Sequence, residues 1–153
     1  MKIGLVSLGC SKNLVDSELM LGLLQEHGYE ATDDPAEAVV LVVNSCGFIE
    51  SAKTESINML LQLSEYKTSG CCKVLILAGC LGQRYGGDLM MELPELDAIV
   101  GTGAWNRLPE AIMAALDGKR PNFTEGHAIL PETSMPRILS TPAHWAYVKI
   151  AEG

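Results

Sequence analysis

Three of the five cysteines occupy equivalent places in the sequence, each at the end of an apolar run. Cys10 follows "LVSLG", Cys46 follows "LVVNS" and Cys80 follows "LILAG", and a helical pattern comes directly after each of them. The free N–H groups and the positive dipole at the start of a helix stabilise a thiolate, which is the form of cysteine that binds metals. We therefore take Cys10, Cys46 and Cys80 as candidate ligands of one metal centre.

Each of these cysteines taken alone is more simply a small buried hydrophobic residue, since free cysteines are often buried. A glycine stands beside each of the three, at Gly9, Gly47 and Gly79, and lets the backbone approach a ligand closely. Cys71 and Cys72 differ, because they precede an apolar run and so belong to the opposite end of a strand. We expect the three equivalent cysteines to bind metal and Cys71 and Cys72 to be incidental.

The spacing of the cysteines bears on which metal they would hold. Structural zinc usually takes four protein ligands, often in close Cys-x-x-Cys pairs, whereas these three thiols are far apart in the sequence. No histidine stands at a comparable joint, because His27 ends a helical pattern and His127 and His144 lie in a proline-rich stretch. Thiolates on separate loops suit an iron–sulfur cluster, and three ligands would leave one iron of a four-iron cluster open.

The elements that must position these thiols alternate between strand and helix. Near-continuous apolar runs predict strands at Lys2–Leu8, Tyr29–Thr32, Val39–Asn44, Lys73–Ala78 and Ala98–Val100. Helical stripes are formed by Val15, Leu19 and Leu23, by Ile49, Ala52, Ile57, Leu60 and Leu61, and by Leu108, Ile112 and Leu116. The pattern predicts an α/β fold with a doubly wound, mostly parallel five-stranded sheet flanked by helices. Loops at the carboxyl ends of such strands share one edge, where functional groups gather.

Two local signals mark a turn and a helix end within this pattern, and the composition changes after it. Asp34-Pro35-Ala36-Glu37 predicts a short helical turn, and Gly118 fits the end of the last helix. We assign residues 1–120 to one domain and residues 121–153 to an extended C-terminal linker, because prolines recur there without a helical period. The final "AYVKIAEG" predicts a strand that enters a further domain.

Composition limits the partners and the compartment. The chain has 153 residues and a formal net charge of −8, from 11 basic and 19 acidic residues, so its direct binding to nucleic acid is not expected. The longest uncharged apolar stretch, 38–49, is too short to span a bilayer, and the apolar N-terminus is too short for a secretory signal. We therefore expect a cytoplasmic protein that does not bind membranes, in which cysteines serve metal chemistry more than disulfides.

Three ordered motifs carry a resemblance to a known family. "LGCSKNLVDSE", "VNSCGFIESAKTESI" and "AGCLGQRY" resemble the N-terminal domain of the radical-SAM methylthiotransferases, and the likeness covers nearly the whole chain. It implies that Cys10, Cys46 and Cys80 hold an auxiliary [4Fe-4S] cluster. It also implies a second [4Fe-4S] cluster and S-adenosylmethionine in a following barrel domain, so that this chain alone would be inactive. A reduced flavodoxin or ferredoxin would be the electron donor.

The motifs also separate two branches of that family. "GCSKN" and "SCGFIESAK" are similar to the branch that methylthiolates the β-carbon of an aspartate in a small-subunit ribosomal protein. The tRNA-modifying branch typically has "GCQMN" and "NTCSIRE" at these joints. Ser45 stands where the family commonly has threonine, and it keeps the hydroxyl. The alternatives are a tRNA substrate and a non-catalytic module that docks onto the ribosomal protein.

Weaker candidates lie around the joints: Lys12, Asn13, Asp16, Ser17, Glu18, Asn44, Gln83, Arg84, Trp105 and Trp145. We expect Asn44 to hydrogen-bond across the Cys46 loop, and Asn13 is a candidate for the same supporting role. For the polar residues after Cys10, from Asn13 to Glu18, we prefer helix capping and a favourable acidic first turn. Lys12 would offset cluster charge, Gln83 and Arg84 would face the cluster or the following domain, and the tryptophans are packing or contact residues.

Overall fold

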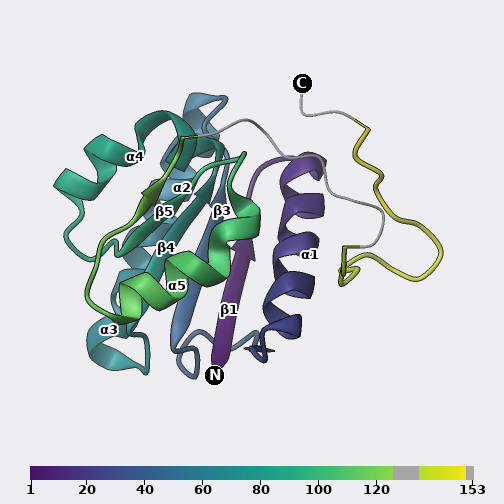
Figure 1. Cartoon of the computed structure of the whole chain (residues 1–153). Helices are drawn as coiled ribbons and strands as arrows, with labels where there is room; N and C mark the ends of the chain where they lie inside the picture. The colour runs from purple at the N-terminus through teal and green to yellow at the C-terminus, as the bar shows by residue number, and fades with distance from the viewer. Residues whose placement is uncertain (126–134, 151–153) are drawn as a thin grey trace.

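The chain forms an open parallel sheet with helices on both faces (Figure 1). The computed structural model describes residues 1–125 and 135–150. Within them the sheet has six strands, all parallel: β1 (Lys2–Ser7), β2 (Glu30–Ala31), β3 (Val40–Ser45), β4 (Val74–Gly79), β5 (Ala98–Val100) and β6 (Asn122–Phe123). The α/β class and the parallel arrangement are as predicted, and the five predicted strands agree to within one residue at each end.

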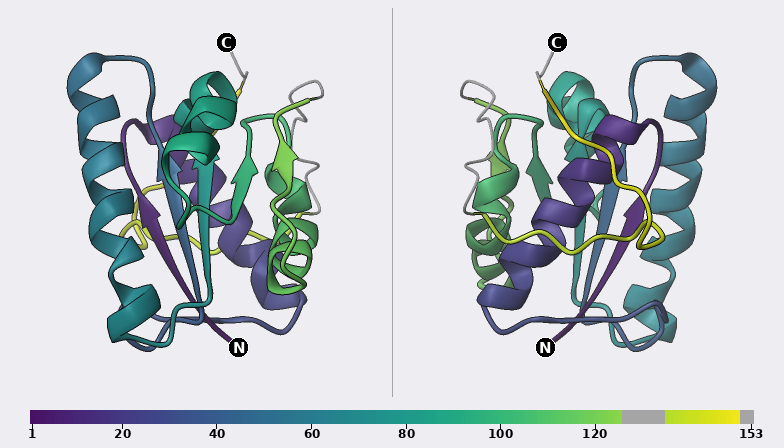
Figure 2. Two further views of the ribbon diagram at one scale, coloured as in Figure 1. Left: turned by 90° about the vertical axis from the view of Figure 1, so that its left-hand side faces the viewer. Right: turned by 90° about the vertical axis from the view of Figure 1, so that its right-hand side faces the viewer.

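Helices cover the two faces of the sheet, as the paired views in Figure 2 show. They are α1 (Ser11–Glu26), α2 (Glu50–Ser64), α3 (Tyr66–Ser69), α4 (Cys80–Glu92), the short 3-10 helix η1 (Trp105–Arg107) and α5 (Leu108–Leu116). Side chains alternate along the central strand β3. Val40 and Val42 pack in the core formed with α1 and α5, while Leu41 and Val43 pack in the core formed with α2 and α4. Two separate apolar cores therefore hold the sheet between its helices.

The sheet extends one strand further than predicted. Asn122 and Phe123, in the segment predicted to be a linker, pair with Ile99 and Val100 of β5. Asn122 and Phe123 directly follow Pro121 and belong to no apolar run, so only the tertiary pairing reveals β6. The second helical stripe is also less buried than predicted, because Ile49 precedes α2 and is 56% exposed.

Hydrogen bonds form at both of the predicted local signals, the turn at residues 34–37 and the helix end at Gly118. The Asp34 carboxylate accepts the Ala36 N–H at 2.9 Å and the Asp34 carbonyl accepts the Glu37 N–H at 3.2 Å, which forms the predicted short turn over residues 35–37. Gly118 follows α5 at a φ of 79°, a left-handed conformation that glycine adopts without strain. Its N–H donates to the Ala115 carbonyl at 3.0 Å, which ends α5 where it was predicted to end.

The strand order places β1 inside the sheet. The order is β2-β1-β3-β4-β5-β6, so the chain passes to one side of β1 and then crosses to the other. This reversal creates a crevice at the carboxyl ends of β1 and β3, where open α/β sheets bind their ligands. The register pairs Ser7 with Asn44 and Ser45 with Gly79, so that β1, β3 and β4 end level with one another.

Residues 135–150, here called the strap, run beside α1 (Figure 1). The strand predicted from "AYVKIAEG" is not formed over residues 146–150, and residues 151–153 lie outside the described part of the chain. The division near residue 120 and the further domain stay predictions. Among the described residues, no helix is both long enough and apolar enough to span a membrane.

Candidate functional site

The three equivalent cysteines lie at the carboxyl edge of neighbouring strands. Cys10 is the N-cap residue of α1 after β1, Cys46 directly follows β3, and Cys80 begins α4 directly after β4. All three are free thiols, of which Cys10 is exposed, Cys46 is buried and Cys80 is partly buried. The sheet thus brings together three residues that are far apart in the sequence.

Close contacts at Gly9 and Gly47 hold the three cysteine loops against one another. A Cβ atom built on Gly9 would stand 2.5 Å from the Cβ and 3.3 Å from the Sγ of Cys46. A Cβ atom on Gly47 would stand 2.9 Å from the Leu81 Cα and 3.3 Å from the Cys80 carbonyl carbon. The absence of these two side chains lets the loop after β1 touch the loop after β3, and the loop after β3 touch the start of α4.

Two hollows open at this edge on either side of Phe48. One of about 690 Å³ is lined by both Cys10 and Cys46, and a second of about 270 Å³ is lined by Cys80, Lys12 and other residues of the edge. Phe48 lines both hollows, and it is 83% exposed. Phe48 therefore stands in solvent between the hollow of Cys10 and Cys46 and the hollow of Cys80.

The Asn13 side chain hydrogen-bonds to both of the first two cysteine loops. Its side chain is 1% exposed, and its Nδ2 group donates to the carbonyls of Leu8 and Ser45, both at 2.8 Å. These carbonyls lie in the loop before Cys10 and at the end of β3, immediately before Cys46. The predicted capping role of Asn13 is therefore wrong, since it bridges two loops and α1 has no side-chain cap.

Asn44 continues the same buried network. Its Nδ2 group donates to the Asn13 carbonyl at 2.7 Å and to the Ser17 hydroxyl at 2.9 Å, and Ser17 donates to Ser7 at 2.8 Å. Among the described residues its Oδ1 atom has no hydrogen-bond partner, and it lies where a Cβ on Gly79 would come within 2.4 Å. Asn44 thus joins β3 to α1 beneath the cysteines.

The pKa of the Cys80 thiol is raised above its ordinary value. Burial is the largest cause, because it disfavours the charged thiolate. Lys12 lowers this pKa, whereas the nearby Cys46 and Cys10 raise it. Lys12 is therefore a neighbouring cation that favours the thiolate form of Cys80.

The acidic residues of α1 serve a purpose that the sequence did not reveal. Capping was predicted for Asp16 and Glu18, but α1 has no acidic residue in its first turn. Instead Glu18 pairs with Arg137 at 2.6 Å, and Asp16 pairs with Lys149 at 2.7 Å. Both cations belong to the strap, more than one hundred residues away in the chain, and no local pattern marks such pairs.

The other candidates are divided between packing and loop support. Arg84 donates to the Gly47 carbonyl at 3.2 Å, so it braces the loop that follows Cys46. Gln83 donates to the Thr124 carbonyl at 2.8 Å. Trp105 is a buried packing residue of the core beneath α1 and α5, whereas Trp145 is partly exposed and stacks edge-on against Tyr147 in the strap.

Cys71 and Cys72 lie away from the site. They come just before β4, at the amino end of the strand whose carboxyl end leads to Cys80. Burial raises the pKa of the Cys72 thiol and keeps it in the neutral form. Their position agrees with the expectation that they are incidental.

The donor chemistry of the edge is compatible with an iron–sulfur cluster. Nowhere in residues 1–125 and 135–150 do three or more His, Cys, Asp or Glu side chains form a group that could hold a metal ion. A multi-iron cluster is wider than one ion, so its thiolate ligands stand farther apart than those of a mononuclear site. Three cysteines on adjoining loops, a buried amide network beneath them and a nearby lysine fit that larger group. Their role as cluster ligands stays a prediction.

Fold and site define an α/β domain of open parallel sheet type with a thiol-lined carboxyl edge. The chain belongs to the uncharacterized protein family UPF0004, whose sequence profile matches residues 2–101.

Curated relatives extend the similarity to the whole chain. Proteins named ribosomal protein uS12 methylthiotransferase RimO are 53% identical in Desulforamulus reducens, over 99% of this chain and 34% of the relative, and 52% identical in Heliobacterium modesticaldum, over 100% and 33%. The relative in Pelotomaculum thermopropionicum is 49% identical, over 99% of this chain and 34% of its own length. The predicted resemblance to methylthiotransferases is confirmed, and the chain spans about a third of the length of these relatives.

Proposed function

We propose that this chain is the cluster-binding, sulfur-donating domain of a methylthiotransferase that modifies ribosomal protein uS12. Similarity along its whole length to enzymes of that name supports the proposal. The observation that carries it is geometric. Cys10, Cys46 and Cys80 leave three neighbouring strands at one edge, and Gly9 and Gly47 let their loops touch.

Cys10, Cys46 and Cys80 would hold the auxiliary [4Fe-4S] cluster. When bound, the cluster would supply an iron without a protein ligand, at which the sulfur for transfer is carried. Asn13 and Asn44 would hold the thiol loops in one orientation through their shared hydrogen bonds. Lys12 would favour deprotonation of the Cys80 thiol, which must lose its proton to bind iron.

The remaining parts of the reaction belong to the full enzyme. We propose that it methylthiolates the β-carbon of an aspartate in uS12, using S-adenosylmethionine and a second [4Fe-4S] cluster carried in a radical-SAM barrel. A flavodoxin or ferredoxin would supply the electron, and the 153-residue chain alone would be inactive. Because its substrate would be a ribosomal protein, the enzyme would act in the cytoplasm.

Anaerobic reconstitution with iron and sulfide tests the site. Cys10→Ala, Cys46→Ala and Cys80→Ala should each lower bound iron and the visible absorption of the cluster. Cys71→Ala and Cys72→Ala are matched controls and should bind iron as the unmodified chain does. Equal iron binding by the Cys10, Cys46, Cys80 triple variant would reject the cluster role and leave a docking module as the explanation.

The substrate requires a separate experiment. A full-length relative should transfer a methylthio group to uS12 and not to tRNA, which mass spectrometry of both substrates distinguishes. The net charge of −8 makes repulsion from tRNA phosphates the physical reason for this expectation. Modification of tRNA alone would assign the chain to the tRNA-modifying branch.

A further inference from the structure

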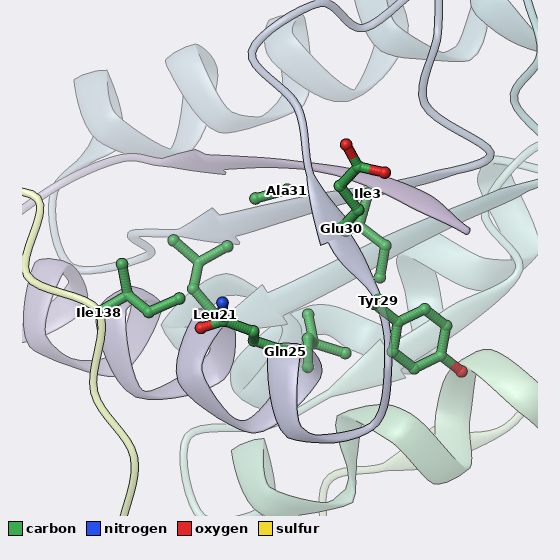
Figure 3. A pocket seen from close by; sticks show the side chains of 8 residues that line it. Ile3, Leu21, Gln25, Tyr29, Glu30, Ala31 and Ile138 are labelled. Carbon is green, nitrogen blue, oxygen red and sulfur yellow. The ribbon is translucent and has the colours of Figure 1, made fainter.

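The strap makes extensive contacts with α1. The Ile138 N–H donates to the Glu18 carbonyl at 3.1 Å, and the Ile138 side chain lies beside Leu21 at a cavity of about 350 Å³ between α1 and the edge of the sheet (Figure 3). This segment was predicted to be an extended linker. The backbone at Ile138 is instead hydrogen-bonded to the first helix, while Leu139, Val148 and Ile150 of the same segment are exposed.

Glu18 is the main polar contact of the strap. Its side chain is 1% exposed, and its carboxylate accepts bonds from the Arg137 guanidinium at 2.6 and 2.9 Å. The other carboxylate oxygen accepts the backbone N–H and the hydroxyl of Ser140, both at 2.7 Å. A carboxylate buried with four donors is fully satisfied only while the strap is docked.

A second buried ion pair fixes the far end of the strap. The Lys149 ammonium lies 2.7 Å from the Asp16 carboxylate, and their side chains are only 3% and 6% exposed. Removing either partner would leave a buried charge without its counter-ion, which is strongly unfavourable. The two ion pairs hold both ends of the segment between Arg137 and Lys149.

Gly22 provides an independent sign that α1 is shaped for the strap. Glycine is among the poorest residues for a helix interior, yet Gly22 lies inside α1. A Cβ atom there would stand 2.3 Å from the carbonyl oxygen and 2.5 Å from the carbonyl carbon of Pro136. The bare helix surface at this position is what allows the strap backbone to approach.

We propose that the strap is a fixed connector, and that Asp16, Glu18 and Gly22 are positioning residues that set where the chain leaves this domain. The docked strap leads back to the cysteine edge, because its residues 147–150 line a hollow of about 210 Å³ with Ser11 and Lys12, next to Cys10. Resting on the proposed function, this inference means that the catalytic barrel is held at a set position relative to the three thiols.

Trypsin digestion of the 153-residue chain tests the docking itself. Trypsin cuts after Arg137 and Lys149, whose side chains are held in the ion pairs, so cleavage there should be slow. Gly22→Ala should raise the cleavage rate at both sites by about tenfold or more, because the added methyl group displaces the Pro136 carbonyl. Gly87→Ala in α4 is the matched control, since a Cβ there meets nothing within 4 Å. Equal rates in both variants would overturn the proposal.

Charge variants give a second, independent readout. In Glu18→Ala the amide of Ser140 should lose hydrogen-exchange protection, while the amides of β3 and β4 keep theirs and show that the fold is intact. Glu18→Gln keeps an acceptor for Ser140 and should restore part of the protection. Unchanged protection of Ser140 in Glu18→Ala would contradict the docking role.

The positional consequence is measured in a full-length relative carrying the Gly22→Ala equivalent. Its kcat should fall while iron content and the KM for S-adenosylmethionine stay unchanged, because Gly22 lies twelve residues along the chain from Cys10, about 18 Å at the rise of a helix, and the substitution alters only where the barrel is held. If digestion shows that the strap is released and kcat is still normal, the positioning role is refuted while the docking of the strap stands. Absence of iron and activity from the unmodified enzyme would instead refute the proposed function, and the digestion results on docking would still stand.

Discussion

Gly9 lies so close to Cys46 that a single methyl group on its Cα would stand 2.5 Å from the Cys46 Cβ atom. Its φ of 97° also lies in the region that residues with a side chain rarely adopt. Cys46 can therefore occupy its observed position only because residue 9 has no side chain. The two loops form one packed unit although α1, β2 and β3 lie between them in the chain.

Gly9→Ala should therefore damage both stability and iron binding. We expect a loss of about 2–4 kcal/mol in the free energy of unfolding, from backbone strain plus the clash with Cys46. Gly28→Ala is the matched control, because Gly28 has a φ of 79° but a Cβ there meets nothing within 4 Å. Urea denaturation and iron content after reconstitution measure the difference. Identical behaviour of the two variants would show that the contact with Cys46 is unimportant.

Asn13→Ala should loosen the cysteine edge without removing a thiol. Two hydrogen bonds, one partly buried to the Leu8 carbonyl and one buried to the Ser45 carbonyl, are lost at about 1 kcal/mol each, so the free energy of unfolding should fall by about 2 kcal/mol. Iron should also bind more weakly. Asn122→Ala in the exposed part of β6 is the control and should unfold like the unmodified chain. Denaturation combined with iron titration tests both effects.

The raised pKa of the Cys80 thiol predicts its alkylation behaviour in the iron-free chain. Burial keeps this thiol protonated, so its alkylation should require a higher pH than alkylation of an ordinary thiol. Lys12→Met should shift the pH dependence of Cys80 further upward, because Lys12 lowers the pKa. Lys73→Met, before β4 at the opposite end of the sheet, should leave it unchanged. Mass spectrometry of iodoacetamide-treated samples across a pH series resolves each cysteine.

Acid should release the strap through Glu18. Burial of this carboxyl group opposes its ionisation, but hydrogen bonds from Ser140 and the Arg137 guanidinium outweigh burial and hold its pKa below the ordinary value of 4.5. A lowered pKa in the folded chain means that Glu18 stabilises docking fully above pH 4.5. This contribution is lost as the pH falls through the lowered value.

Hydrogen exchange at Ser140, corrected for the intrinsic pH dependence of exchange, measures this release. Protection should be constant between neutral pH and the ordinary carboxyl pKa and should decrease at lower pH. The Ser140 amide donates directly to the Glu18 carboxylate, so its protection reports the protonation of Glu18. Glu18→Gln should remove the acid-dependent step, and its persistence in that variant would assign the step to another group.

The sequence was sufficient for those features that depend on local patterns. Apolar runs followed by helical periods located β1, β3 and β4, and the parallel arrangement that they imply brought Cys10, Cys46 and Cys80 to one edge. The strap contacts were missed because Glu18 and Arg137 are 119 residues apart, and local rules could only suggest a capping role for an acid near a helix start. β6 was missed because Asn122 and Phe123 belong to no apolar run.

The position of β1 between β2 and β3 also governs the order in which the cysteine edge can be built during translation. β1 leaves the ribosome first, but both of its ladder partners, β2 and β3, emerge after α1 has been made. A nascent chain that stops short of β4 has neither Cys80 nor the strand that holds it. Any group that requires all three thiols must therefore be inserted late, once this part of the protein has emerged from the exit tunnel and folded.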